Sequence, residues 1–367
     1  MKILYAIQGT GNGHLARATE IVPILRKMAE TDVLVSGCQA DIAMPFTIDY
    51  QRYGLSFMFG SHGGVHFLKT VSKLRPFRFL KDVFQLPLEK YDLVISDFEP
   101  VSAWACKLRG KKCIGLSHQN AVLHKNAPKP KKDDWAGKFI LKYYAPVSKK
   151  YGFHFKALDK TNFTPVIRSF IRNAKPQNKK HYTVYLPAFG NNEIERILSS
   201  FPEIQWEVFS KHSKETFQKN NISFQPVSLE NFNRSFINCE GILCNAGFET
   251  PAEAIYMGKK LCVVPMKYQY EQACNARFLS EMGVLVISDL TNHIKELGFW
   301  LKIENSIQIK YPDNISETMQ TIISQEKPNN KNKKTNRNGK SGQINLQNTH
   351  FGNVVIATSS LLWTGQR

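Results

Sequence analysis

A glycine-rich turn near the N-terminus holds a residue suited to acid–base chemistry. The apolar run at residues 3–7 leads directly into Gly9-Thr10-Gly11-Asn12-Gly13-His14. Glycines let a ligand approach the backbone of such a turn closely. The helix dipole disfavours the charged form of a histidine at the start of the next helix, which suits a proton acceptor. A histidine that only donates to a loop carbonyl fits the spacing equally well.

A histidine base needs a partner that orients it, and Asp97 is the first candidate. Asp97 directly follows the apolar run at residues 93–96, at the end of a strand that could face the same cleft as the glycine-rich turn. A role as the N-cap of the next helix is an equally good interpretation of Asp97. Glu99, two residues later, is the competing partner for His14.

The segment from Cys244 to Gly258 predicts a helix start that binds an anion. Thr250-Pro251-Ala252-Glu253 has the pattern of a capping box with proline at the first helical position, and a strand and a turn through Gly247 precede it. The free N–H groups of such a helix end bind phosphate. In a purely structural interpretation, Glu253 only closes the cap.

A polar pair follows the next predicted strand. Glu271 and Gln272 come shortly after Val264-Pro265, near the start of a helix. Adjacent carboxylate and amide side chains can accept from and donate to neighbouring sugar hydroxyls. By composition alone, a solvated helix start is the more frequent explanation of such a pair.

Alternating strands and helices must position these residues. Apolar runs alternate with helical stretches through residues 3–116, and the alternation restarts at residue 183. The predicted fold is therefore α/β, with two doubly wound Rossmann-like domains that face a cleft. We expect an N-terminal domain at 1–165, a linker at 166–180, a C-terminal domain at 181–326 and a disordered basic tail at 327–367.

Composition narrows the class of protein. The 367 residues include 49 Lys and Arg against 30 Asp and Glu, which gives a formal net charge of +19. No stretch is apolar for long enough to span a bilayer, and the N-terminus lacks the pattern of a signal peptide, so we expect a cytoplasmic protein. The seven cysteines contain no CxxC pair and are expected to be reduced core residues.

The positive charge is concentrated in two segments. Residues 125–180 hold 15 Lys and Arg against three Asp, and residues 327–340 hold six Lys and Arg with no acid. In the first of these, the basic aromatic segment, lysines alternate with aromatic and aliphatic residues. It is either a solvated face over ordinary core residues or a contact surface for anionic membrane. Nucleic acid is not expected, because the rest of the chain is close to neutral.

The two halves together resemble a GT-B glycosyltransferase. The C-terminal half resembles glycosyltransferase family 28, which includes the peptidoglycan N-acetylglucosaminyltransferase, and the UDP-glycosyltransferases. The resemblance covers residues 1–300 and is strongest from Asn245 through Ala276, where the glycines, Glu253 and Glu271-Gln272 follow the family order. It implies inverting transfer of a sugar from a nucleotide sugar, with UDP as the expected nucleotide, to a hydroxyl acceptor. No metal and no resident cofactor are expected.

The resemblance also implies that residues 1–165 form the acceptor and catalytic domain and residues 181–326 the nucleotide-sugar donor domain. It further implies roles for single residues. His14, oriented by Asp97, would remove the proton of the acceptor hydroxyl, beside a glycine-rich loop of Gly11, Asn12 and Gly13. Glu253 would hold the nucleotide ribose, and Glu271 and Gln272 the donor sugar. The full donor site implied in this way is Arg168, Asn245, Gly247, Phe248, Glu249, Thr250, Glu253, Glu271 and Gln272.

Two other functions stay open at this point. A nucleotide-sugar 2-epimerase shares the fold and the donor pocket but needs no acceptor. A non-catalytic protein that binds a nucleotide sugar or an anionic membrane fits the charge cluster. For the transferase, we expect a lipid-linked or polymeric acceptor that docks near the basic aromatic segment, and a peripheral position on the inner membrane face.

Overall fold

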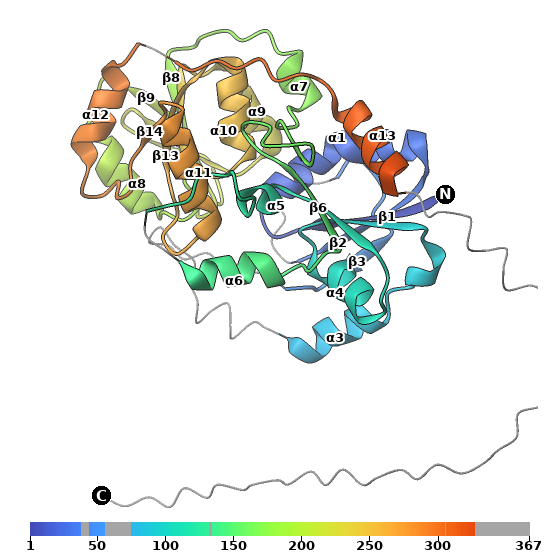
Figure 1. The fold of residues 1–367 in the computed structure, drawn as a ribbon. Coiled ribbons are helices and arrows are strands. Elements are labelled where there is room, and N and C mark those ends of the chain that lie inside the picture. The colour runs from blue at the N-terminus through green and yellow to red at the C-terminus, as the bar shows by residue number, and fades with distance from the viewer. Residues whose placement is uncertain (38–43, 56–74, 132–133, 305, 327–367) are drawn as a thin grey trace, which may run out of the picture. The chain divides into compact units, whose positions relative to one another are not determined.

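Two seven-stranded sheets, one in each half of the chain, form the framework of the computed structural model (Figure 1). The structure describes residues 1–37, 44–55, 75–131, 134–304 and 306–326, so the predicted tail at 327–367 lies outside the described residues. Both sheets have the mixed order of a doubly wound fold, which confirms the predicted fold class.

The first sheet is parallel throughout and has the order β3-β2-β1-β4-β5-β6-β7. Its strands are β1 (Lys2–Gln8), β2 (Glu30–Ser36), β3 (Tyr50–Arg52), β4 (Leu93–Asp97), β5 (Cys113–Leu116), β6 (Lys149–Phe153) and β7 (Asn162–Phe163). The helices of this half are α1 (Asn12–Met28), α3 (Pro76–Phe84), the short 3₁₀ helix η1 (Leu88–Lys90), α4 (Pro100–Leu108), α5 (His118–Val122), α6 (Trp135–Tyr143) and α7 (Ser169–Arg172).

The second sheet has the order β10-β11-β9-β8-β12-β13-β14, and only the β10–β11 pair is antiparallel. Its strands are β8 (His181–Tyr185), β9 (Gln205–Ser210), β10 (Phe217–Lys219), β11 (Ile222–Pro226), β12 (Gly241–Asn245), β13 (Lys260–Val264) and β14 (Leu285–Val286). The helices that follow or flank them are α8 (Asn191–Leu198), α9 (Leu229–Asn238), α10 (Glu249–Met257), α11 (Tyr270–Glu281), α12 (Ile294–Lys302) and α13 (Ile315–Glu326).

The central strand β1 shows why its apolar run folds in this way. Successive side chains of a strand point to opposite faces, so a run without polar interruption suits a strand that is covered on both sides. Tyr5 and Ile7 pack in one apolar cluster with residues of α1, whereas Leu4 and Ala6 pack in another with residues of α4. The register pairs Ile7 with Asp97, which brings the carboxyl ends of β1 and β4 side by side.

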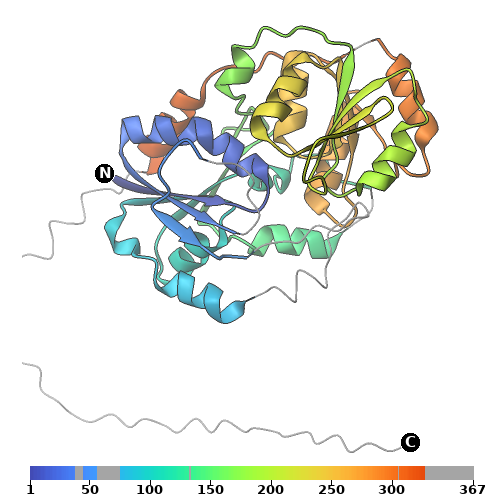
Figure 2. The same ribbon diagram turned by 180° about the vertical axis from the view of Figure 1, so that it is seen from behind.

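The last described helix, α13, returns to the first half of the chain. It lies beside α1 in both views (Figures 1 and 2), and Glu326 accepts hydrogen bonds from Lys149 Nζ at 2.5 Å and Tyr151 Oη at 2.8 Å. The predicted C-terminal domain at 181–326 therefore ends in a helix that packs on the first half of the chain. Apolar side chains of both halves also share one core cluster, which includes Phe155 and Phe248.

Two further expectations concern cysteine and membrane spans. Six of the seven cysteines lie in the described part of the chain, and all six are buried free thiols. Among the described residues, no helix combines the length and the apolar character needed to cross a bilayer.

Candidate active site

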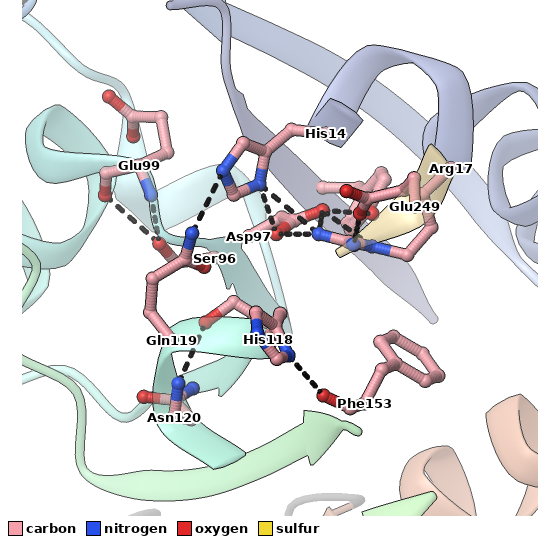
Figure 3. A network of polar contacts seen from close by, with 12 residues as sticks. His14, Arg17, Ser96, Asp97, Glu99, His118, Gln119, Asn120, Phe153 and Glu249 are labelled. Carbon is pink, nitrogen blue, oxygen red and sulfur yellow. Dashed lines mark hydrogen bonds and ion pairs between the residues drawn. The ribbon is translucent and has the colours of Figure 1, made fainter. Parts of the chain in front are cut away.

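The structure brings His14 and Asp97 together at the carboxyl ends of β1 and β4 (Figure 3). Gly11 precedes α1 with a φ of 93°, a conformation that favours glycine, and the helix then presents His14 in its first turn. His14 Nδ1 lies 2.8 Å from Asp97 Oδ1, and the Asp97 side chain is fully buried. The neutral ring donates from Nδ1 to Asp97, so Nε2 is the nitrogen that can accept a proton.

Glu99 is the helix cap in this region, and Asp97 is not. The Glu99 carboxylate accepts from the main-chain N of Val101 at 2.7 Å and of Ser102 at 2.6 Å, and from Ser36 Oγ at 2.5 Å. These bonds satisfy the first turn of α4. The capping interpretation of Asp97 and the pairing of Glu99 with His14 are both wrong.

Arg17 is a site residue that sequence reasoning missed. Its Nη2 lies 2.7 Å from Asp97 Oδ1 and 2.8 Å from Oδ2, and its Nε lies 3.2 Å from Oδ2. Tyr5 Oη adds a weaker hydrogen bond of 3.3 Å to the same carboxylate. Residues three apart on a helix lie on one face, so the spacing of His14 and Arg17 is the signal that points to this contact.

The charges of this cluster set its protonation. Burial favours the neutral form of Asp97, but Arg17 and His14 outweigh it and hold the pKa of the carboxyl below its ordinary range. Burial likewise lowers the pKa of His14, yet the charge of Asp97 and its hydrogen bond raise the pKa above the ordinary histidine value. The net effect favours the imidazolium, opposite to the direction expected from the helix dipole, because a buried carboxylate lies in direct contact with the ring.

Gln119, in α5, connects His14 to the second half of the chain and was also missed. Its Nε2 lies 3.3 Å from His14 Nε2 and donates to Glu271 Oε2 at 2.9 Å. Its Oε1 is buried and has no hydrogen-bond partner among the described residues. Next to it, His118 stacks on Phe248 with ring centroids 3.9 Å apart. The two halves thus meet directly beside His14.

A cavity of about 200 Å³ lies beside this cluster and is lined by both halves of the chain. Of the predicted residues, those that line it are Gly11, Asn12, Gly13, Arg168, Asn245, Gly247, Phe248, Glu249, Thr250 and Gln272. Gln272 is held in place because its Oε1 accepts from Met266 N at 2.9 Å. His14, Asp97, Glu253 and Glu271 do not line this cavity.

The start of α10, at the cavity wall, differs from the predicted capping box. The helix begins at Glu249, Pro251 is its third residue and not its first, and no side chain caps it. Glu253 instead accepts from Arg168 Nε at 2.7 Å and Nη2 at 2.6 Å, and both residues are buried. The capping interpretation of Glu253 is wrong, because its carboxylate pairs with Arg168. Its contact with the nucleotide ribose stays a prediction.

The arrangement of this site can be compared with known proteins. Residues 1–302 match glycosyl transferase family 1. The chain belongs to this family. A search of curated proteins found no match.

Solved structures of other glycosyltransferases share the fold of this transferase. MurG of Acinetobacter baumannii is 15% identical with a TM-score of 0.50, over 88% of this chain and 99% of the other. The kitacinnamycin glycotransferase is 11% identical with a TM-score of 0.52, over 89% and 99%. UGT89C1 of Arabidopsis thaliana, solved with quercetin, is 9% identical with a TM-score of 0.51, over 89% and 94%. These structural similarities support the GT-B fold with two Rossmann-like domains.

Two more polar residues of the transferase line the cavity and were not predicted. Lys211 follows β9, and Ser228 is the N-cap of α9. Both lie beyond strand ends, where ligand loops of such sheets gather, so their position in the alternating pattern is the signal for them. No group of three His, Cys, Asp or Glu side chains with the geometry of a metal site occurs in the part of the chain that the structure describes.

Proposed function

We propose that this glycosyltransferase transfers a sugar from a UDP-sugar to a hydroxyl acceptor with inversion at the anomeric carbon and without a metal ion or resident cofactor. The observation that carries the proposal is the 2.8 Å pairing of His14 with buried Asp97 beside a cavity lined by both halves. A base oriented by a carboxylate next to an anion-binding helix start is the arrangement that such a transfer needs.

The proposed reaction is a single displacement. His14 Nε2 takes the proton of the acceptor hydroxyl as that oxygen forms a bond to the anomeric carbon. The bond from this carbon to the diphosphate oxygen breaks on the opposite face, and the diphosphate leaves with the electron pair, which inverts the configuration. Asp97 stabilises the imidazolium that His14 becomes. Gly247 leaves open space in which a phosphate can approach the backbone, and Thr250, in the first turn of α10, places a main-chain N–H near the departing phosphates.

The donor half supplies the rest of the proposed site. Asn245 and Thr250 line the cavity with Lys211, whose ammonium suits a diphosphate. Gln272 faces the same cavity and is the proposed ligand of the donor sugar. Glu271 lies outside the cavity and contacts Gln119, so we propose that it acts on the sugar from the side of the base.

We also propose that the acceptor is lipid-linked and that the protein binds the surface of an anionic membrane on the inner face. Helix α6, in the basic aromatic segment, has no buried side chain, and its Trp135 and Phe139 are 77% and 59% exposed. Phe77 and Phe84 of α3 are 87% and 63% exposed. Lysines and arginines lie between these aromatic residues, and aromatic side chains flanked by cations suit anionic headgroups.

A panel of UDP-, GDP- and dTDP-sugars, added without acceptor, tests the donor and the reaction class. We expect stabilisation by UDP-sugars, slow release of UDP and no change after treatment with EDTA. A product epimerised at C2 would establish the 2-epimerase instead, although the family match favours a transferase. Absence of a thermal shift with every nucleotide would reject the donor site.

A further inference from the structure

One ion pair of the site joins the two halves of the chain. Arg17 Nη1, from α1, contacts Glu249 Oε1 at the first residue of α10 (Figure 3). The Arg17 side chain is 1% exposed and that of Glu249 is 21% exposed. The pair therefore reaches from the edge of the cavity into the buried cluster around the base.

The glycine-rich turn is shaped to admit the Glu249 carboxylate. A Cβ atom at Gly13 would lie 2.5 Å from Glu249 Oε2, which is closer than two such atoms can approach. Gly13 is the second residue of α1, where an alanine would otherwise be favoured over glycine. The acceptor half thus provides both a gap and a cation for a carboxylate of the donor half.

Charges alternate along this cluster. The order is His14, Asp97, Arg17 and Glu249, and each member contacts the next. The charges of Asp97 and Arg17 largely cancel, so the charge of Glu249 decides whether the group around the ring is neutral or negative. A negative group stabilises the imidazolium that forms when the base takes a proton.

We propose that Glu249 is a positioning residue for the base: it acts through Arg17, so that the donor half completes the base of the acceptor half. The inference rests on the proposed role of His14 as the base. It differs from the place of Glu249 in the implied donor site, because the carboxylate is turned toward Arg17. It also implies that the base is fully active only when the two halves are together.

The groups around His14 determine the direction in which its pKa should change. Burial lowers the pKa of the ring, Asp97 on β4 and Glu249 on α10 raise it, and Arg17 on α1 lowers it. Gln119 on α5 is uncharged, and it separates the ring from the carboxylate of Glu271 on α11. Removal of the Glu249 charge should therefore lower the pKa of His14.

The test is an NMR titration of His14 in the full-length protein, with its signals assigned by their absence in His14→Asn. In Glu249→Gln we expect the titration midpoint to fall by about 0.5 pH unit or more, as a unit charge one side chain away implies. Glu281→Gln is the matched control, because it removes the same charge from an exposed ion pair with Arg277 and should leave the midpoint unchanged.

Gly13→Ala provides a second variant that keeps the charge and displaces the carboxylate. We expect its midpoint to fall as well, by less than in Glu249→Gln. An unchanged midpoint in both variants, or an equal shift in Glu281→Gln, would overturn the proposal. The titration needs no substrate, so failure of the nucleotide-sugar panel with a shifted midpoint would reject the proposed function and leave the coupling in place.

Discussion

At the scale of single residues, the site depends on long-range charge pairs that local patterns do not contain. His14, Asp97 and Glu253 could each be chosen from their neighbours in the sequence, because a glycine-rich turn and strand ends mark them. The pairing of His14 with Asp97 was predicted, whereas the arginine partners of Asp97 and Glu253 were not. Arg168 is 85 residues from Glu253, and the capping pattern at Thr250 to Glu253 failed because this distant arginine binds the carboxylate more strongly than a main-chain N–H does.

Replacement of His14 tests its proposed role as the base. We expect His14→Asn to lower kcat of transfer by about 10²- to 10⁴-fold, because proton transfer is lost, and to leave UDP affinity within twofold. Transfer assays stopped at fixed times measure kcat, and calorimetric titration with UDP measures the UDP affinity. His293→Asn, at an exposed position of the second half, is the control and should change neither. Normal transfer by His14→Asn would remove the histidine from the mechanism.

The acid limb of the pH profile follows from the charges around His14. Transfer needs the neutral ring, and Asp97 holds the pKa of His14 above the ordinary value of 6.5 even though burial opposes this. Activity should therefore begin to fall, as the pH is lowered, at a pH above 6.5. A profile of kcat/KM against pH measures this limb. A fall in activity that begins only below pH 6.5 would show that Asp97 does not raise the pKa of His14.

The buried pair of Glu253 and Arg168 gives a prediction that distinguishes a structural role of the glutamate from direct contact with the ribose. Glu253→Gln leaves a buried guanidinium partly unpaired, so we expect a loss of about 3 kcal/mol and a clear fall in Tm. Glu281→Gln, in the exposed pair with Arg277, should change the free energy of unfolding by less than about 0.5 kcal/mol. Weaker UDP binding by Glu253→Gln with an unchanged Tm would instead support direct contact with the ribose.

At the scale of elements, strands with long apolar runs were predictable and elements without such runs were not. The strands β1, β4, β12 and β13 each contain an apolar run because helices cover both of their faces. β6 reads Lys-Lys-Tyr-Gly-Phe, and α6 buries none of its side chains, so neither carries the periodic apolar signal of a covered element. The pairing of β6 with β5 and the packing of α6 on α11 place these two elements, and both are tertiary contacts.

The exposed aromatic residues of α6 give the prediction for this scale. We expect Trp135→Ser with Phe139→Ser to reduce co-sedimentation with vesicles of anionic phospholipid several-fold, because aromatic anchors are lost while lysines remain. The stability should change by less than about 0.5 kcal/mol, since both side chains are largely exposed. Phe299→Ser, 63% exposed on α12, is the control and should leave binding unchanged. Equal binding by all variants would remove α6 from the membrane surface.

At the scale of the whole molecule, the sequence indicated two halves but not how closely they are joined. The alternation of strands and helices repeats in each half, and this repetition is a local property. The contacts that join the halves come from positions with no shared pattern: His118 stacks on Phe248, and α13 packs on α1. One apolar cluster consequently runs through residues of both halves.

A shared core predicts that the two halves unfold together. We expect residues 1–326, within the full chain, to melt in one calorimetric transition whose van't Hoff and calorimetric enthalpies agree. Phe248→Ala removes the ring that stacks on His118, so it should weaken the joint core and make the calorimetric enthalpy exceed the van't Hoff enthalpy. Phe209→Ala, a buried ring that contacts Phe232 within the second half, should lower Tm and keep the two enthalpies equal. Two separate transitions in the unaltered protein would mean that the contacts at the base do not couple the halves, and Glu249 could then reach Arg17 only part of the time.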